Sequence, residues 1–193
     1  MELAQQRYGA KVQPMLERWY QVMQSATSIS EQEKIKRVNE FFNRRVQFVE
    51  DAEAWGKSDY WATPLETLGR GQGDCEDFSI AKYFTLRFLD IPNNKLRLTY
   101  VKAKIGGLQS DITQAHMVLG YYPDPQGEPM ILDNLITDIR PASRRPDLAP
   151  VFSFNSEGLW VGSGPAQESS GSSTAKLSRW RDLIARMQAE GFE

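Results

Sequence analysis

Cysteine and histidine are almost absent from this 193-residue sequence, which contains one of each, Cys75 and His116. A single cysteine excludes an intrachain disulfide. The shortage of both residue types also excludes zinc sites built from several Cys and His side chains. A Cys–His catalytic pair remains open, and it would have to consist of these two residues.

Long hydrophobic runs and a surplus of charge are also missing. No apolar stretch is long enough for a transmembrane helix. Lys and Arg total 23 against 25 Asp and Glu, and this balance argues against a general nucleic-acid binder. The polar residues 1–6 lack the basic segment of a signal peptide, so the compartment cannot be read from this end. The length predicts one soluble domain with a core of its own.

The first half of the chain is typical of helices. Apolar residues recur at helical spacing over residues 11–24. Residues 30–33 and 63–66 are capping boxes that open two further helices. Asp74 is the expected N-cap of a fourth helix over residues 75–89.

The second half is typical of β-strands joined by turns. Alternating or apolar segments rich in β-formers predict the following strands: 96–101, 115–122, 130–133, 151–154 and 159–161. Because helices come first and an antiparallel sheet follows, we expect an α+β domain.

The domain is expected to span residues 1–161. Residues 162–175 are rich in Gly and Ser and predict a flexible linker. Residues 176–193 are expected to contain a terminal helix with one apolar face. That face either packs back on the domain or binds a partner.

Cys75 is expected at a helix N-terminus. The thiolate is the reactive form of cysteine, and the free N–H groups of a helix N-terminus favour it. The same N–H groups can stabilise the oxyanion of a tetrahedral intermediate, with Gln72 or Trp55 as further donors by residue type. The alternative is a buried cysteine with only a structural role.

His116 and Asp133 are expected on neighbouring strands. A hairpin that pairs Leu119 with Met130 would place His116 opposite Asp133. A carboxylate in that position would orient the imidazole, and the imidazole would hold the thiolate of Cys75. The alternative is a histidine satisfied within its strand and an aspartate that only ends a turn.

Three carboxylates surround Cys75, those of Asp74, Glu76 and Asp77. Their negative charge raises the pKa of a neighbouring thiol and opposes the thiolate. A divalent cation would neutralise them, and clustered oxygen ligands suit Ca²⁺. Alternatively, the acidic residues serve only as caps of the helix, in an enzyme that needs no metal.

Two blocks of sequence carry a resemblance to a known family. Residues 59–68 read Asp-Tyr-Trp-Ala-Thr-Pro-Leu-Glu-Thr-Leu, and residues 71–78 read Gly-Gln-Gly-Asp-Cys-Glu-Asp-Phe. Together with Ala115–Leu119 and Leu132–Asn134, they closely resemble the bacterial transglutaminase-like cysteine proteinases. The resemblance covers about residues 30–160.

The resemblance implies a papain-like/transglutaminase-like fold with Cys75 as nucleophile, His116 as base and Asp133 as the orienting acid. It further implies calcium dependence, with ligands at Asp74, Glu76 and Asp77. Proteins of this kind act in the periplasm. They cut a large surface adhesin near its N-terminus at a di-alanine site, which releases the adhesin and disperses biofilm. An inner-membrane receptor for cyclic-di-GMP sequesters them.

Two other functions fit the same residues. A transglutaminase would share the acyl-enzyme chemistry, with an amine in place of water. A non-catalytic module would use the cleft only to hold an adhesin or a receptor. The aromatic residues Trp55, Tyr60 and Trp61 are expected either to line that cleft or to pack in the core.

Overall fold

The computed structural model describes residues 2–161 and 171–192. The helices are α1 (Glu2–Tyr8), α2 (Gln13–Ala26), α3 (Glu31–Arg45), α4 (Asp51–Ala54), α5 (Pro64–Arg70), α6 (Cys75–Phe88) and α7 (Gly171–Ala189). The strands are β1 (Gln47–Phe48), β2 (Gln72–Gly73), β3 (Leu96–Lys104), β4 (Thr113–Tyr121), β5 (Met130–Leu132), β6 (Arg140–Pro141), β7 (Leu148–Phe154) and β8 (Leu159–Val161). Within the described ranges, no helix is long and apolar enough to cross a membrane.

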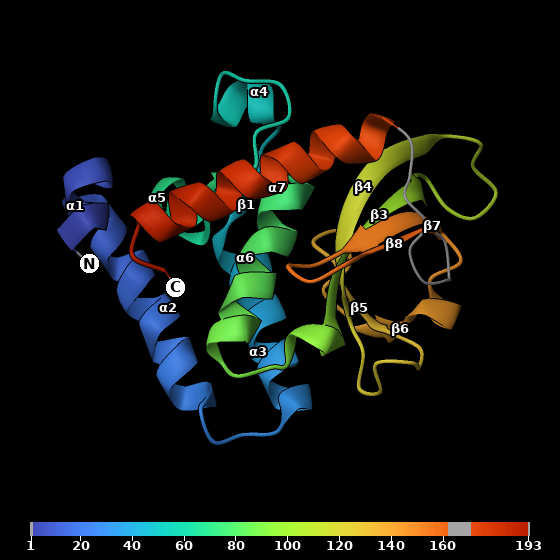
Figure 1. Cartoon of the computed structure of the whole chain (residues 1–193), viewed down its shortest axis with the longest axis horizontal. Helices are drawn as coiled ribbons and strands as arrows, with labels where there is room; N and C mark the ends of the chain where they lie inside the picture. The colour runs from blue at the N-terminus through green and yellow to red at the C-terminus, as the bar shows by residue number, and fades with distance from the viewer. Residues whose placement is uncertain (1, 162–170, 193) are drawn as a thin grey trace.

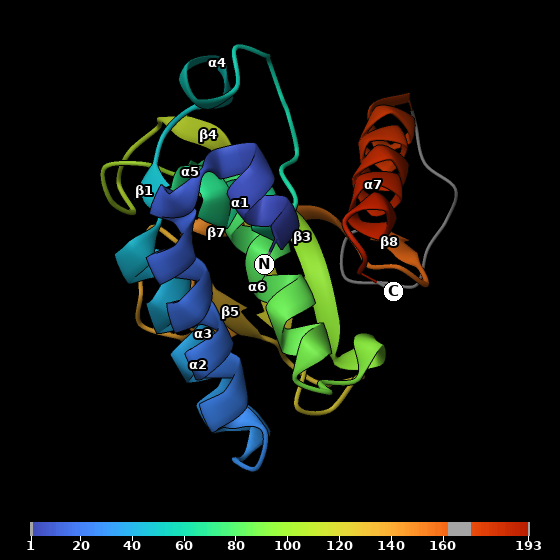
Figure 2. The same ribbon diagram turned by 90° about the vertical axis from the view of Figure 1, so that its left-hand side faces the viewer.

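The α+β prediction is confirmed. Six strands form an antiparallel sheet in the order β6-β5-β4-β3-β7-β8, and β1 and β2 form a separate parallel pair. Helix α6 packs against β4 and β3 of the sheet (Figure 1). Helices α2 and α3 lie on one side of α6, and α7 lies on the other (Figure 2). One large apolar cluster joins these helices to the inner face of the sheet.

Capping residues begin α3, α5 and α6 where the sequence predicts. Thr63 and Glu66 form both hydrogen bonds of a capping box, as do Asp74 and Asp77. Helix α5 ends at Arg70, and Gly71 follows it with a left-handed φ of 66° that favours glycine.

The register of β4 and β5 differs from the predicted one. Leu119 pairs with Leu132 rather than with Met130, a displacement of two residues. Side chains alternate across a strand with a period of two, so this displacement leaves every residue on its predicted face. His116 and Asp133 therefore still meet, although β5 ends at Leu132 and the two residues are not directly opposite.

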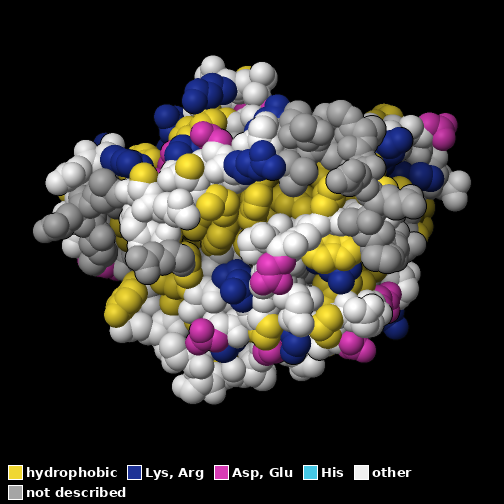
Figure 3. All heavy atoms as spheres, viewed as in Figure 1, with side chains coloured by type: hydrophobic (Ala, Val, Ile, Leu, Met, Phe, Trp, Pro, Cys, Tyr) yellow, Lys and Arg dark blue, Asp and Glu magenta, His cyan; other side chains and the backbone are white. Residues whose placement is uncertain are grey.

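Helix α7 begins at Gly171, five residues before the predicted start, so residues 171–175 are helical rather than part of a linker. Residues 162–170 of the predicted linker lie outside the described residues. Trp180 stacks on Phe84 with a ring-centroid distance of 5.6 Å, and Leu183 is fully buried. Figure 3 shows the band of hydrophobic side chains on this face, alongside α7 and over α6.

Candidate active site

Cys75 is the first residue of α6, as predicted. Asp74 caps the helix by accepting hydrogen bonds from the backbone N–H groups of Glu76 and Asp77. Gly73 allows Asp77 to come close, because a Cβ on Gly73 would lie 2.7 Å from the Asp77 side chain. The chain thus passes directly from β2 into α6 and places the thiol at the N-terminal end of the helix.

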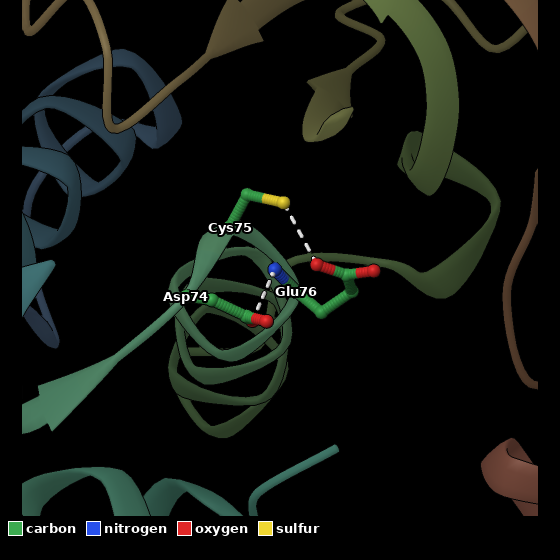
Figure 4. Close-up of side chains that lie close together, drawn as sticks. All are labelled: Asp74, Cys75 and Glu76. Atoms are coloured by element: carbon green, nitrogen blue, oxygen red, sulfur yellow. Dashed lines mark hydrogen bonds between the residues drawn. The ribbon is translucent and has the colours of Figure 1, made fainter. Parts of the chain in front are cut away.

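The thiol of Cys75 contacts an acidic neighbour. Sγ lies 2.7 Å from Oε2 of Glu76, whose other oxygen accepts a hydrogen bond from the Tyr100 hydroxyl at 2.8 Å. Figure 4 shows the side chains of Cys75 and Glu76 turned toward one another, while Asp74 caps the helix. Burial raises the pKa of the Cys75 thiol well above its usual value, and the charges of Glu76 and Asp74 raise it further.

His116 and Asp133 form a buried hydrogen bond of 2.7 Å between Nε2 and Oδ1. Oδ1 also accepts from the backbone N–H of Leu135, and Oδ2 accepts from the guanidinium of Arg145 at 2.8 Å. Burial by itself would raise the pKa of Asp133. The hydrogen bonds from His116, Leu135 and Arg145 outweigh burial and lower it to about 2, so this carboxylate is ionised at neutral pH.

Cys75 and His116 line the same cleft, which has a volume of about 540 Å³. One part of its wall is acidic and another part is apolar. The acidic lining residues are Glu50, Asp51, Asp59, Asp74 and Glu76. The apolar lining residues are Phe48, Ala52, Ile105, Ala115 and Leu135. The cleft therefore brings together a thiol, an imidazole held by a carboxylate, and a concentration of negative charge.

The predicted acidic residues divide into two overlapping groups. Asp74 and Glu76 flank Cys75, whereas Asp74 and Asp77 gather with a third carboxylate, that of Asp51 from α4. In each group, one possible ligand atom per residue lies within 4.8 Å of the others. Asp51 is not among the predicted ligands, because it lies more than twenty positions upstream of Asp74 and carries no local motif.

The buried carboxylates repel one another. Burial and the charges of Glu76, Asp77 and Asp51 raise the pKa of Asp74 to about 10. Burial and Asp51 raise the pKa of Asp77 to about 8, although hydrogen bonds from Ala62, Trp55 and Asp74 oppose this shift. Oδ1 of Asp51 is buried and has no hydrogen-bond partner. These acidic oxygens, one of them unsatisfied, fit the hard oxygen ligands that Ca²⁺ takes.

The aromatic candidates do not line the cleft. Trp61 is fully buried and stacks on Phe154, while Trp55 donates a hydrogen bond to Asp77 and lies against Arg70. Tyr60 hydrogen-bonds Glu66 and stays outside the cleft lining. Gln72 and Trp55, the two further oxyanion donors considered from sequence, are likewise outside it.

A family model described as "Bacterial transglutaminase-like cysteine proteinase BTLCP" matches residues 13–147. The chain belongs to the bacterial transglutaminase-like cysteine proteinases. This result confirms the resemblance read from the two sequence blocks. It also indicates that the chain is a cysteine protease.

Solved structures of Legionella pneumophila LapG are similar to this bacterial transglutaminase-like cysteine proteinase. One is 39% identical with a TM-score of 0.79, covering 96% of this chain and 94% of that chain. A calcium-bound form is 39% identical with a TM-score of 0.80, covering 96% of each chain. An EGTA-treated form has the same TM-score and sequence identity as the calcium-bound form. No curated protein matches the chain.

Proposed function

We propose that the chain is a calcium-dependent cysteine endopeptidase in which Cys75, His116 and Asp133 form the catalytic triad. The observation that carries this proposal is the cleft in which a thiol at a helix N-terminus faces the same space as a buried His116–Asp133 pair. The family membership supports the same assignment.

Asp133 is hydrogen-bonded to Nε2 of His116, which leaves Nδ1 to receive the proton of the Cys75 thiol. The thiolate attacks a peptide carbonyl, and the backbone N–H of Cys75 stabilises the resulting oxyanion, because Asp74 already holds the N–H groups of Glu76 and Asp77. His116 then gives its proton to the departing amine, and an acyl-enzyme forms. Water attacks the acyl-enzyme, which releases the carboxylic acid product and restores the thiol.

A calcium ion would be held by carboxylates drawn from Asp51, Asp74, Glu76 and Asp77. It would supply positive charge that lets these groups ionise together and that offsets their effect on Cys75. The solved calcium-bound form of Legionella pneumophila LapG supports this assignment. Glu76 would then have a further partner besides the Cys75 thiol and the Tyr100 hydroxyl.

We further propose the substrate and the control that the resemblance implies. The substrate is the N-terminal region of a large surface adhesin, cut at a di-alanine site in the periplasm, so that the adhesin is released and biofilm disperses. An inner-membrane receptor for cyclic-di-GMP would inhibit the protease by sequestering it. Small residues at the cut suit a cleft whose wall near His116 includes Ala115.

The experiment combines thiol reactivity with product mass. Iodoacetamide alkylation of Cys75 is followed against pH, with Ca²⁺ and with EGTA, and the single cysteine makes the signal unambiguous. We expect a midpoint well below the free-thiol value of about 8.5 in Ca²⁺ and a higher one in EGTA. A midpoint near or above 8.5 in both conditions would overturn the proposal.

Peptides that contain Ala-Ala are incubated with the chain and with its Cys75→Ala variant. Hydrolysis predicts two shorter products with the wild type in Ca²⁺ and none with the variant. The peptides also carry a glutamine, so a single heavier product in which a primary amine has replaced the ammonia of that side chain would instead indicate a transglutaminase. If the Cys75→Ala variant still binds the adhesin fully, and neither the variant nor the wild type cleaves it, the chain would instead be a binding module.

A further inference from the structure

Arg145 contacts the His116–Asp133 pair through the carboxylate of Asp133. It follows the short turn at Ala142–Arg144 that leads from β6 into β7, and 3% of it is exposed. Nη2 donates to Oδ2 of Asp133 at 2.8 Å and to Oδ2 of Asp147 at 2.8 Å. Nε donates to Oδ1 of Asp147 at 3.0 Å. Asp147 thus fixes the guanidinium, and the guanidinium reaches the carboxylate of Asp133.

The three donors to Asp133 divide its two oxygens. Oδ1 faces His116 and the N–H of Leu135, and Oδ2 faces Arg145. Rotation of the carboxylate would break bonds on both sides, so this arrangement fixes its orientation. Charge-assisted bonds of this kind are stronger than neutral ones and have a defined geometry.

Stability alone does not explain a guanidinium at this depth. Removing a charge from water is costly, and replacing a buried ion pair by apolar side chains is often neutral or stabilising. Arg145 also lines a small cavity of about 220 Å³ whose other walls are mostly apolar, including Val101, Val118 and Ile131. An aliphatic residue would suit this environment better than a guanidinium whose Nη1 is buried without a partner.

We infer that Arg145 is a positioning residue of the proposed triad, which holds the Asp133 carboxylate ionised and turned toward Nε2 of His116. This inference rests on the proposed function. Arg145 is not one of the residues that line the cleft, and it acts through Asp133 and His116.

Other charged groups also face this chain of contacts. Lys82 of α6 is fully buried and acts on Asp133 through its charge, and Asp147 lies beyond Arg145. On the cleft side, His116 shares its space with Cys75 and Glu76. A test must therefore change Arg145 or its anchor Asp147 while leaving Lys82, Cys75 and Glu76 in place.

The test uses the full chain in saturating Ca²⁺, as wild type, Arg145→Met and Arg145→Lys. The control is Arg140→Met, which removes an exposed arginine paired with Asp138 instead. The first readout is the downfield proton resonance of the His116 ring N–H held by Asp133, which is unambiguous in a chain with one histidine. The second readout is the iodoacetamide alkylation rate of Cys75 at pH 7.

We expect Arg145→Met to lose the ring N–H resonance to solvent exchange and to slow alkylation at least tenfold. Arg145→Lys should recover part of both, because it keeps the charge but loses the planar fork. Arg140→Met should match the wild type. If Arg145→Met does not fold, Asp147→Asn takes its place, and it should broaden the resonance because it releases the guanidinium from its second partner.

A resonance and an alkylation rate equal to wild type in Arg145→Met, or in Asp147→Asn where it is substituted, would overturn the inference while leaving the proposed function intact. Failure of this inference can be distinguished from failure of the proposed function. If wild-type Cys75 itself reacts no faster than a free thiol, the proposed function fails, and this inference fails with it.

Discussion

Replacement of Asp133 by Asn should remove a pH-dependent part of the free energy of unfolding. The folded protein lowers the pKa of this carboxyl from 3.8 to about 2, and the side chain is fully buried, so solvent screening does not reduce the effect. A difference of this size corresponds to about 2.5 kcal/mol. Because the folded pKa is the lower one, this stabilisation is fully present above about pH 4 and is lost as the pH falls through about 2.

The measurement is urea unfolding of wild type and Asp133→Asn in EGTA, at several pH values from 7 downward. At pH 7 we expect the variant to be less stable by about 2–3 kcal/mol, because Asn keeps the shape but loses the charge that Arg145 and His116 face. The gap should narrow as the pH falls from about 4 and close near pH 2, since a protonated Asp133 resembles Asn. The carboxylates of the cleft titrate equally in both proteins, so their contribution cancels.

Two results would refute this reasoning. Equal unfolding free energies at pH 7 would mean that the hydrogen bonds to Asp133 do not favour its ionised form. A gap that stays constant down to the lowest accessible pH would mean that the substitution acts through packing rather than through charge. The matched control is Asp138→Asn, since Asp138 is exposed and pairs with Arg140. That substitution should change the stability by less than about 1 kcal/mol.

Three further substitutions test separate parts of the structure. Gly73→Ala should lower the free energy of unfolding, measured in urea, by about 1–3 kcal/mol, because its Cβ would meet Asp77 at 2.7 Å. A variant as stable as the wild type would contradict this contact. Leu183→Ala should lower the free energy of unfolding by about 2–5 kcal/mol, because Leu183 of α7 is fully buried in the core. A loss near zero would show that α7 detaches from the core without a cost in stability. Glu76→Gln should lower the pKa of Cys75 in EGTA, read from alkylation against pH, because it removes a neighbouring charge. An unchanged midpoint would contradict that cause.

The elements with local signals could be predicted from the sequence. Capping residues such as Thr63 and Asp74 act within one helical turn, so their pattern identifies helix starts without knowledge of the rest of the fold. The faces of β4 and β5 were also predictable, because alternation fixes which side a residue occupies. The exact register was not, since a displacement of two residues preserves that alternation.

The parts of the site that depend on distant segments could not be predicted in this way. Asp51 reaches Asp74 only because α4 is placed beside the start of α6, and Arg145 reaches Asp133 only after β6 and the following turn return the chain. Neither residue stands in a pattern that marks it among the 48 charged residues of types Lys, Arg, Asp and Glu. Contacts between such distant segments are set by tertiary packing.

The start of α6 places two requirements on the same residues. A helix N-terminus favours acidic side chains, and Asp74 and Asp77 satisfy its free N–H groups. A nucleophilic thiol at the same position requires the opposite, because each added negative charge favours the thiol over the thiolate. The two requirements are compatible only if positive charge is supplied from outside the helix. His116 can supply part of this positive charge when protonated. However, His116 lies against Asp133, whose negative charge already balances that of the imidazolium. A cation at the carboxylates would supply the rest, so the acidic cluster that opposes the nucleophile in isolation would make its activity conditional on calcium.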